Sequence, residues 1–148
     1  LRKRDKREKM DLARLKRYKD KLNLVSRRIQ EIQEWQEDFL KQEKDKLACY
    51  KALQEAVEGC FDLIAMMVKD EGQIPKDDYV NLELLGPGKQ ISLASRGFLA
   101  EANGLRNRIV HEYESLDQDL FAKNLRENYT DFEKYLKYIE EYLNKKSA

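Results

Sequence analysis

Apolar residues recur every three or four positions along most of the chain, a spacing that places them on one face of an α-helix. The first stripe predicts a helix from about Lys9 into the region of Trp35, and it consists of Leu15, Tyr18, Leu22, Val25, Ile29, Ile32 and Phe39. The second predicts a helix from about Asp45 to Val68, and it consists of Tyr50, Leu53, Val57, Cys60, Ile64 and Met67. We place the boundary between them near Lys44 and expect the second helix to be the most buried element.

Glycine and proline residues interrupt the second half of the chain. The segment from Asp70 to Pro75 ends the second helix, and Gly86-Pro87-Gly88 marks a further break, so Asp77 to Leu85 is expected to form a short helix between two turns. A third long helix is expected from about Ile91. A last helix is expected after Asp117, with an apolar face made of Phe121, Leu125, Phe132, Leu136, Ile139 and Leu143. Four main helices and a short one pack most simply as an antiparallel bundle, so the predicted fold class is all-α.

The composition agrees with a helical domain. Of the 148 residues, 39% are charged and only six are Gly and two Pro, a balance that favours long helices over sheets. A chain of this length buries roughly 70% of the surface of its unfolded form, so residues 1–148 are expected to form one domain. No run approaches the roughly 18 apolar residues of a membrane span, and the basic N-terminus lacks the apolar segment of a secretory signal. We therefore expect a cytoplasmic protein that does not associate with a membrane.

Charge is distributed unevenly along the chain. Residues 1–28 contain thirteen Lys or Arg and four Asp or Glu, a net charge of +9, whereas the remaining residues carry −8. This basic N-terminal helical segment can attract a polyanion such as RNA, or an acidic partner protein. The alternative is that these charged side chains are simply the solvent-exposed face of a helix.

The two cysteines and the single histidine leave little scope for metal binding. Cys49 and Cys60 are eleven residues apart on one predicted helix, a separation of roughly 16 Å that is too long for a disulfide bond. We expect both to be reduced thiols in the core. With one histidine in the chain there is no set of zinc ligands, and no Gly-rich phosphate loop is present. No metal or other cofactor is expected.

The residues with the clearest chemical potential lie near the end of the third long helix. Arg106, Asn107, Arg108, His111 and Tyr113 fall within eight positions. Histidine is the side chain whose unperturbed pKa lies closest to neutrality, so proton transfer at physiological pH would run through His111. The arginine guanidinium presents a fixed fork of donors that suits phosphate. Together they indicate phosphodiester chemistry.

Helix geometry predicts where these side chains point. At about 100° per residue, His111 lies about 200° from Ile109, and Asn107 lies about 200° from Leu105, so both are expected to point away from the apolar face. Asn107 and His111 stand one turn apart, so the amide could orient the imidazole. The alternative is that the histidine and arginine are ordinary surface residues at a helix end, where a cationic side chain interacts favourably with the helix dipole. A close backbone approach would explain Gly104 inside this helix.

The string from Arg106 to Tyr113 reads Arg-x4-His-x-Tyr and resembles the motif of HEPN-domain proteins, specifically the HepT family of toxins. The segment from Tyr50 to Glu58, the Gly72 to Leu85 loop and the final amphipathic helix also occur in the order expected of that family. The resemblance covers roughly residues 30 to 143. It implies a helical homodimer in which the motifs of two subunits meet in a cleft and cleave RNA without a metal.

The resemblance also implies a role for each motif residue. Arg106 and His111 would be the catalytic pair. Beside them, we expect Asn107 and Arg108 to support the site and bind RNA. Tyr113 would be adenylylated (AMPylated) by a partner nucleotidyltransferase antitoxin, MntA, which silences the toxin. Cleavage needs both a base for the ribose 2′-OH and an acid for the leaving oxygen, and a dimer would supply two copies of His111.

Two hypotheses from other functional classes remain open. The chain could be a non-catalytic module that presents a nucleotide or substrate to a separately encoded nucleotidyltransferase. It could also be a structural helical adaptor, because the stripe of the first helix and the tyrosines of the last could pack against a partner. RNA cleavage by the isolated protein separates these hypotheses from the ribonuclease.

Overall fold

The computed structural model describes residues 10–85, 93–127 and 129–147, and within them it contains helices and no strand. The α-helices are α1 (Leu12–Trp35), α2 (Glu43–Asp70), α3 (Asp78–Leu84), α4 (Leu93–Glu112), α5 (Gln118–Glu127) and α6 (Tyr129–Ser147). Two short 3-10 helices, η2 (Gln36–Asp38) and η3 (Tyr113–Ser115), follow α1 and α4. The all-α class predicted from the sequence is confirmed.

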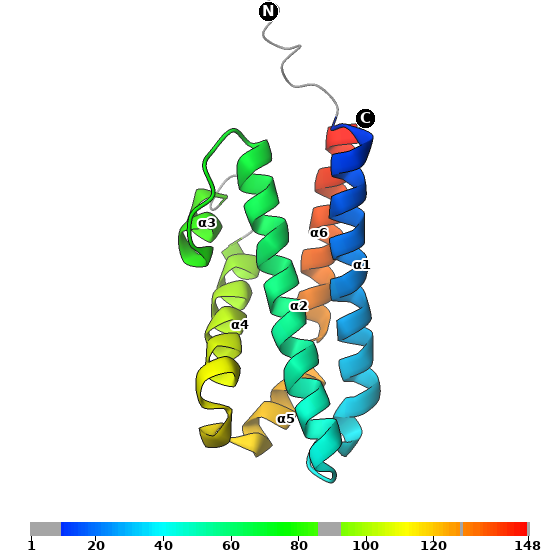
Figure 1. Ribbon diagram of the computed structural model, residues 1–148, viewed down its shortest axis with the longest axis vertical. Helices are drawn as coiled ribbons and strands as arrows, with labels where there is room; N and C mark the ends of the chain where they lie inside the picture. The colour runs from blue at the N-terminus through cyan, green and yellow to red at the C-terminus, as the bar shows by residue number, and fades with distance from the viewer. Residues whose placement is uncertain (1–9, 86–92, 128, 148) are drawn as a thin grey trace, which may run out of the picture.

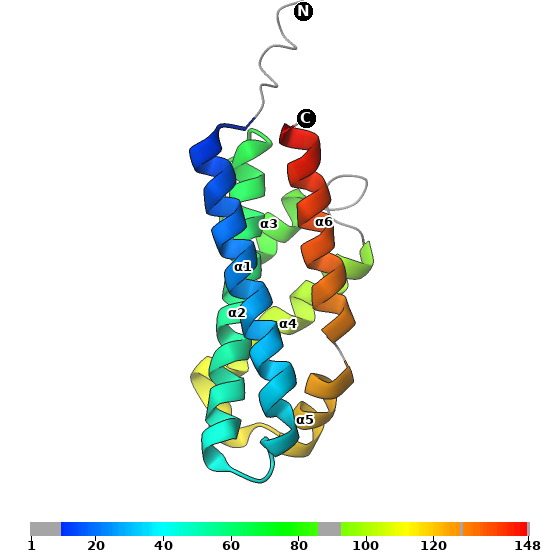
Figure 2. The ribbon, with the colours of Figure 1, turned by 90° about the vertical axis from the view of Figure 1, so that its right-hand side faces the viewer.

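The four long helices form an antiparallel bundle (Figure 1). Helix α2 packs against α1 on one side and α4 on the other, and α6 closes the ring by contacting both α1 and α4. The short helix α3 lies outside the bundle beside α2, and α5 crosses the end at which α1 turns into α2 (Figures 1 and 2). The predicted architecture of four main helices plus a short one is therefore correct, with α5 as an addition.

The prediction of a single last helix is wrong, because that segment forms two helices. Helix α5 packs beside η2, where Phe121 stacks on Phe39 with ring centroids 5.3 Å apart. Helix α6 runs back along α1 and α4, and the ring centroids of Phe132 and Phe98 lie 4.8 Å apart. The apolar spacing continues through both helices, and such spacing reports which side of a helix is buried but not the direction of its axis. A change of direction lets both sets of contacts form.

Helix boundaries differ from the predicted ones by a few residues. Helix α1 begins at Leu12 because the Asp11 carboxylate accepts a hydrogen bond of 2.8 Å from the Arg14 backbone N–H, which caps the helix. The predicted start at Lys9 and the rest of residues 1–9 lie outside the described residues. So do the predicted break at 86–88 and the predicted start of the next helix at Ile91. Residues 12–28 of the basic segment are helical as expected.

One continuous core fills the bundle, and α2 contributes the largest share of its buried residues, as predicted. Cys49 and Cys60 are both buried free thiols. Burial, assisted by nearby Asp45, raises the pKa of the Cys49 thiol to about 11, so it stays protonated. Among the described residues, no helix is both long and apolar enough to cross a bilayer.

Helix α1 approaches α2 closely at Gly59. A Cβ atom added there would lie 2.5 Å from Val25 Cγ2, whereas one added at exposed Gly97 of α4 would meet nothing within 4 Å. Gly59→Ala is therefore expected to lower the free energy of unfolding by about 1–3 kcal/mol through overpacking. Gly97→Ala is expected to raise it by about 0.5–1 kcal/mol through helix propensity. Urea unfolding followed by circular dichroism measures both free energies. A Gly59→Ala variant as stable as the Gly97→Ala variant would contradict the close contact at Gly59.

Candidate functional site

The motif residues occupy the last two turns of α4 and the start of η3. Helix α4 ends at Glu112, whose backbone leaves the helical region at φ −153° and ψ 41°. His111 is therefore in the final turn of α4, and Tyr113 lies beyond it in η3. These residues sit at the end of the bundle where α5 crosses, as Figure 1 shows.

Arg106 is held between helices by two carboxylates. Its Nη1 lies 3.6 Å from Glu58 Oε2 on α2, and its Nη2 lies 3.7 Å from Asp78 Oδ2 on α3. The Arg106 side chain is only 21% exposed, and its Nε is buried with no hydrogen-bond partner among the described residues. The pairing fixes the guanidinium while leaving part of its donor capacity unused.

Helix α3 places Asp78 at this junction. Asp77 caps the helix by accepting a hydrogen bond of 3.0 Å from the Val80 backbone N–H. The buried Asn81 amide ties the entrance of the helix down, because its Oδ1 accepts from the Lys76 N–H at 2.6 Å. Burial raises the pKa of the Asp78 carboxyl, and Arg106 opposes this shift only in part.

His111 is exposed to solvent and makes no hydrogen bond or ion pair with the described residues. The prediction that it points away from the core is confirmed. Asn107 is half-buried, and no hydrogen bond joins its amide to His111 in the single chain. The imidazole is therefore free to meet a ligand or a second protein surface.

The single chain does not bring Arg106 and His111 together. Five residues along a helix correspond to a rotation of about 140°. The Arg106 side chain faces α2 and α3 through its two carboxylate partners, whereas His111 faces solvent. A site that uses both needs a group from outside this chain or a movement of Arg106.

Tyr113 is half-exposed and packs one side of its ring against Tyr50. The Tyr113 side chain is 44% exposed, and its ring centroid lies 6.3 Å from that of Tyr50. Tyr50 is buried, and its hydroxyl lacks a hydrogen-bond partner among the described residues. Burial raises the pKa of the Tyr50 hydroxyl, so it remains protonated at neutral pH. One side of the Tyr113 ring is thus supported by Tyr50, and part of the side chain remains accessible to solvent.

The sequence also led to predictions for two further residues of α4, Arg108 and Gly104. Arg108 is exposed and lines a cavity between α4 and α5. The close backbone approach predicted at Gly104 is wrong, because an added Cβ would meet only the Tyr79 hydroxyl at an ordinary 4.0 Å. In the described part of the chain, no group of three or more His, Cys, Asp or Glu is arranged to hold a metal ion.

Sequence reasoning did not find Glu58, Asp78 or Tyr50 as parts of this site. Glu58 and Asp78 are two of many acidic residues on helix surfaces, and Tyr50 belongs to the apolar stripe of α2. Their proximity to the motif depends on how α2 and α3 pack against α4, which no local pattern reports.

A comparison with known protein families identifies the chain. The model of the family described as "Ribonuclease HepT-like" matches residues 8–139. The chain belongs to the HepT-like ribonuclease family. Two proteins of Archaeoglobus fulgidus, each named "Putative RNase", are similar to it. One is 38% identical over 70% of this chain and 76% of its own length, and the other is 30% identical over 89% of this chain and 97% of its own length.

Solved structures show the same fold as this HepT-like chain. An AMPylated HEPN toxin of Shewanella oneidensis, determined in complex with an MNT antitoxin, aligns with a TM-score of 0.76. The alignment covers 83% of this chain and 96% of the toxin, with 24% sequence identity. This chain therefore has the same all-helical fold as that toxin.

Proposed function

We propose that this HepT-like protein is a metal-independent endoribonuclease toxin that cleaves tRNA or mRNA in a cleft between two copies of the chain. The observation that carries the proposal is the exposed, unpaired His111 at the end of α4, turned away from a fixed Arg106 on the same helix. A two-fold arrangement would supply the groups that one chain keeps apart. Such an activity belongs in the cytoplasm.

In this mechanism, two histidines share the proton transfers. The imidazole of His111 from one subunit takes the proton of a ribose 2′-OH, whose oxygen attacks the adjacent phosphorus. His111 of the other subunit protonates the leaving 5′ oxygen, so the products carry a cyclic phosphate and a free 5′-OH. One histidine per chain becomes two per cleft, which matches the two roles.

Arg106 would neutralise the charge that develops on the phosphorus. Its ion pairs of 3.6 and 3.7 Å are longer than the roughly 2.7–2.9 Å of a charge-assisted hydrogen bond. Its N–H groups can therefore still donate to a phosphate, while Glu58 and Asp78 limit the directions in which the side chain can move. Asn107 and Arg108 lie one turn before the histidine and would contact the RNA backbone.

Tyr113 would be the site of AMPylation by a cognate MntA-like nucleotidyltransferase antitoxin. Its accessible edge and the support of its ring by Tyr50 suit a side chain that another enzyme must reach. The Shewanella oneidensis toxin is described as tri-AMPylated and in complex with an MNT antitoxin, which supports this assignment. An adenylyl group adds bulk and negative charge beside His111 and so would repel RNA.

A second candidate function is the nucleotide-binding subunit of a two-component nucleotidyltransferase. The cavity beside Arg108 favours it, because a free nucleotide could bind there without any chemistry at His111. This candidate predicts binding of nucleotides and no cleavage of RNA.

Purified protein incubated with total cellular RNA in excess EDTA tests the proposal. Light scattering and mass spectrometry first establish that the sample is dimeric and unmodified. We expect shortened tRNA or mRNA on a denaturing gel, with cyclic phosphate at the new ends. Intact RNA after incubation with a verified unmodified dimer would overturn the ribonuclease and favour the nucleotide-binding subunit.

A further inference from the structure

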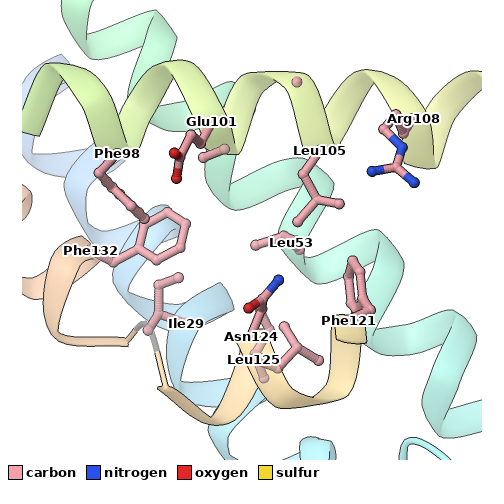
Figure 3. Close-up of a pocket in the computed structure, with 13 residues that line it drawn as sticks. Ile29, Leu53, Phe98, Glu101, Leu105, Arg108, Phe121, Asn124, Leu125 and Phe132 are labelled. Atoms are coloured by element: carbon pink, nitrogen blue, oxygen red, sulfur yellow. The ribbon is translucent and has the colours of Figure 1, made fainter. Parts of the chain in front are cut away.

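A cavity of about 400 Å³ lies between α4 and α5, with α1 and α2 forming its floor and α6 one of its sides (Figure 3). Its size is within the range of small-molecule pockets. Most of the lining is apolar, and the aromatic rings of Phe98, Phe121 and Phe132 form part of its walls. An aromatic-lined cavity of this size can hold a planar ring.

Three polar side chains of the lining reach toward the cavity. Figure 3 shows the Glu101 carboxylate and the Arg108 guanidinium extending from α4, and the Asn124 amide extending from α5 toward them. None of the three makes a hydrogen bond or ion pair with the rest of the described chain. Their hydrogen-bonding capacity is therefore available to a ligand.

We propose that this cavity is a nucleobase-binding pocket and that its occupant is a base of the RNA strand next to the cleaved bond, an assignment that rests on the proposed function. Proteins read unpaired RNA bases by stacking them on aromatic rings and bonding to their edges. The Asn124 amide offers both a donor and an acceptor, and the Glu101 carboxylate offers acceptors. Arg108 at the side of the cavity would bind the phosphate of the same nucleotide.

The polar set also predicts which bases the pocket prefers. Adenine, guanine and cytosine carry an exocyclic amino group that can donate to the Glu101 carboxylate. Uracil instead presents two carbonyl oxygens on either side of its single ring N–H, and these oxygens repel a carboxylate. The pocket is therefore expected to select a base with an amino group over uracil.

The position of the pocket relative to His111 follows from the helix register. Arg108 and His111 are three residues apart, so their Cβ atoms are neighbours at about 5–6 Å. Glu101, Arg108 and His111 lie within about 80° of one another around α4. A base held in the pocket with its phosphate on Arg108 thus places the next phosphate along the strand toward the imidazole.

The first arm of the test measures binding and does not depend on cleavage. Calorimetric titration with AMP, GMP, CMP and UMP is expected to show weakest binding for UMP. Asn124→Ala and Glu101→Gln are each expected to weaken binding of the preferred nucleotide about tenfold. Asn144→Ala, which removes an exposed asparagine on α6, is the matched control and should bind as the native protein does. Melting curves establish that all variants are folded.

The second arm measures cleavage of short RNAs that differ only in the base next to the cleaved bond. The native protein should cleave the substrate with the preferred base faster than its uracil counterpart, and Asn124→Ala should bring this ratio toward one. Cleavage with a ratio that Asn124→Ala and Glu101→Gln leave unchanged would overturn the pocket while the ribonuclease stands. Selective nucleotide binding without any cleavage would overturn the ribonuclease and assign the pocket to a free nucleotide.

Discussion

Replacing His111 with alanine is expected to reduce the rate of RNA cleavage by about 10²- to 10⁴-fold, the contribution of a positioned acid or base. The side chain is exposed and has no partner in the described chain, so its removal should change the free energy of unfolding by less than about 0.5 kcal/mol. Cleavage of a defined RNA in EDTA and urea unfolding of the same preparation measure the two effects. Loss of activity without loss of stability is the combination that identifies a reacting group.

The controls for this prediction separate chemistry from charge and from assembly. Lys137→Ala removes an exposed cation on α6, far along the chain from the motif, and should leave cleavage unchanged. Mixed dimers with one native and one His111→Ala subunit should also be impaired, because each cleft would then lack either its acid or its base. Native cleavage rates for His111→Ala would remove His111 from the mechanism.

The second large effect is expected at Tyr113, where substitution with phenylalanine should abolish AMPylation by the cognate nucleotidyltransferase and ATP. The native protein should gain the mass of one or more adenylyl groups and lose its cleavage activity. Tyr113→Phe keeps the ring that packs on Tyr50 and removes only the acceptor oxygen, so it should stay folded, unmodified and active. Intact-mass spectrometry and RNA cleavage before and after the reaction measure both outcomes.

Tyr79 offers a matched control for the modification. Tyr79 on α3 is 46% exposed, close to the 44% of Tyr113, so the two residues present similar fractions of their surface to an enzyme. Tyr79→Phe should be modified and silenced like the native protein. Undiminished mass gain by Tyr113→Phe, or its loss in Tyr79→Phe, would move the modification away from the motif tyrosine.

Several properties of this protein could be predicted from the sequence because they depend on local periodicity. The three-four spacing defines which residues of each helix are apolar neighbours, and it correctly predicted the all-α class and the burial of Cys49 and Cys60. The outward direction of His111 followed from its angular offset from Ile109, since the phase of a helix is set within a few residues. The motif from Arg106 to Tyr113 also pointed correctly to the HepT-like family.

Other properties emerged only from the tertiary structure, because they depend on how distant segments pack. The division of the last segment into α5 and α6 leaves the apolar spacing intact, so only the contacts of Phe121 with Phe39 and of Phe132 with Phe98 reveal it. Glu58 and Asp78 come from two other helices, and nothing in their own neighbourhoods marks them as partners of Arg106. The cavity between α4 and α5 has the same origin, since its volume is what remains after five helices pack together.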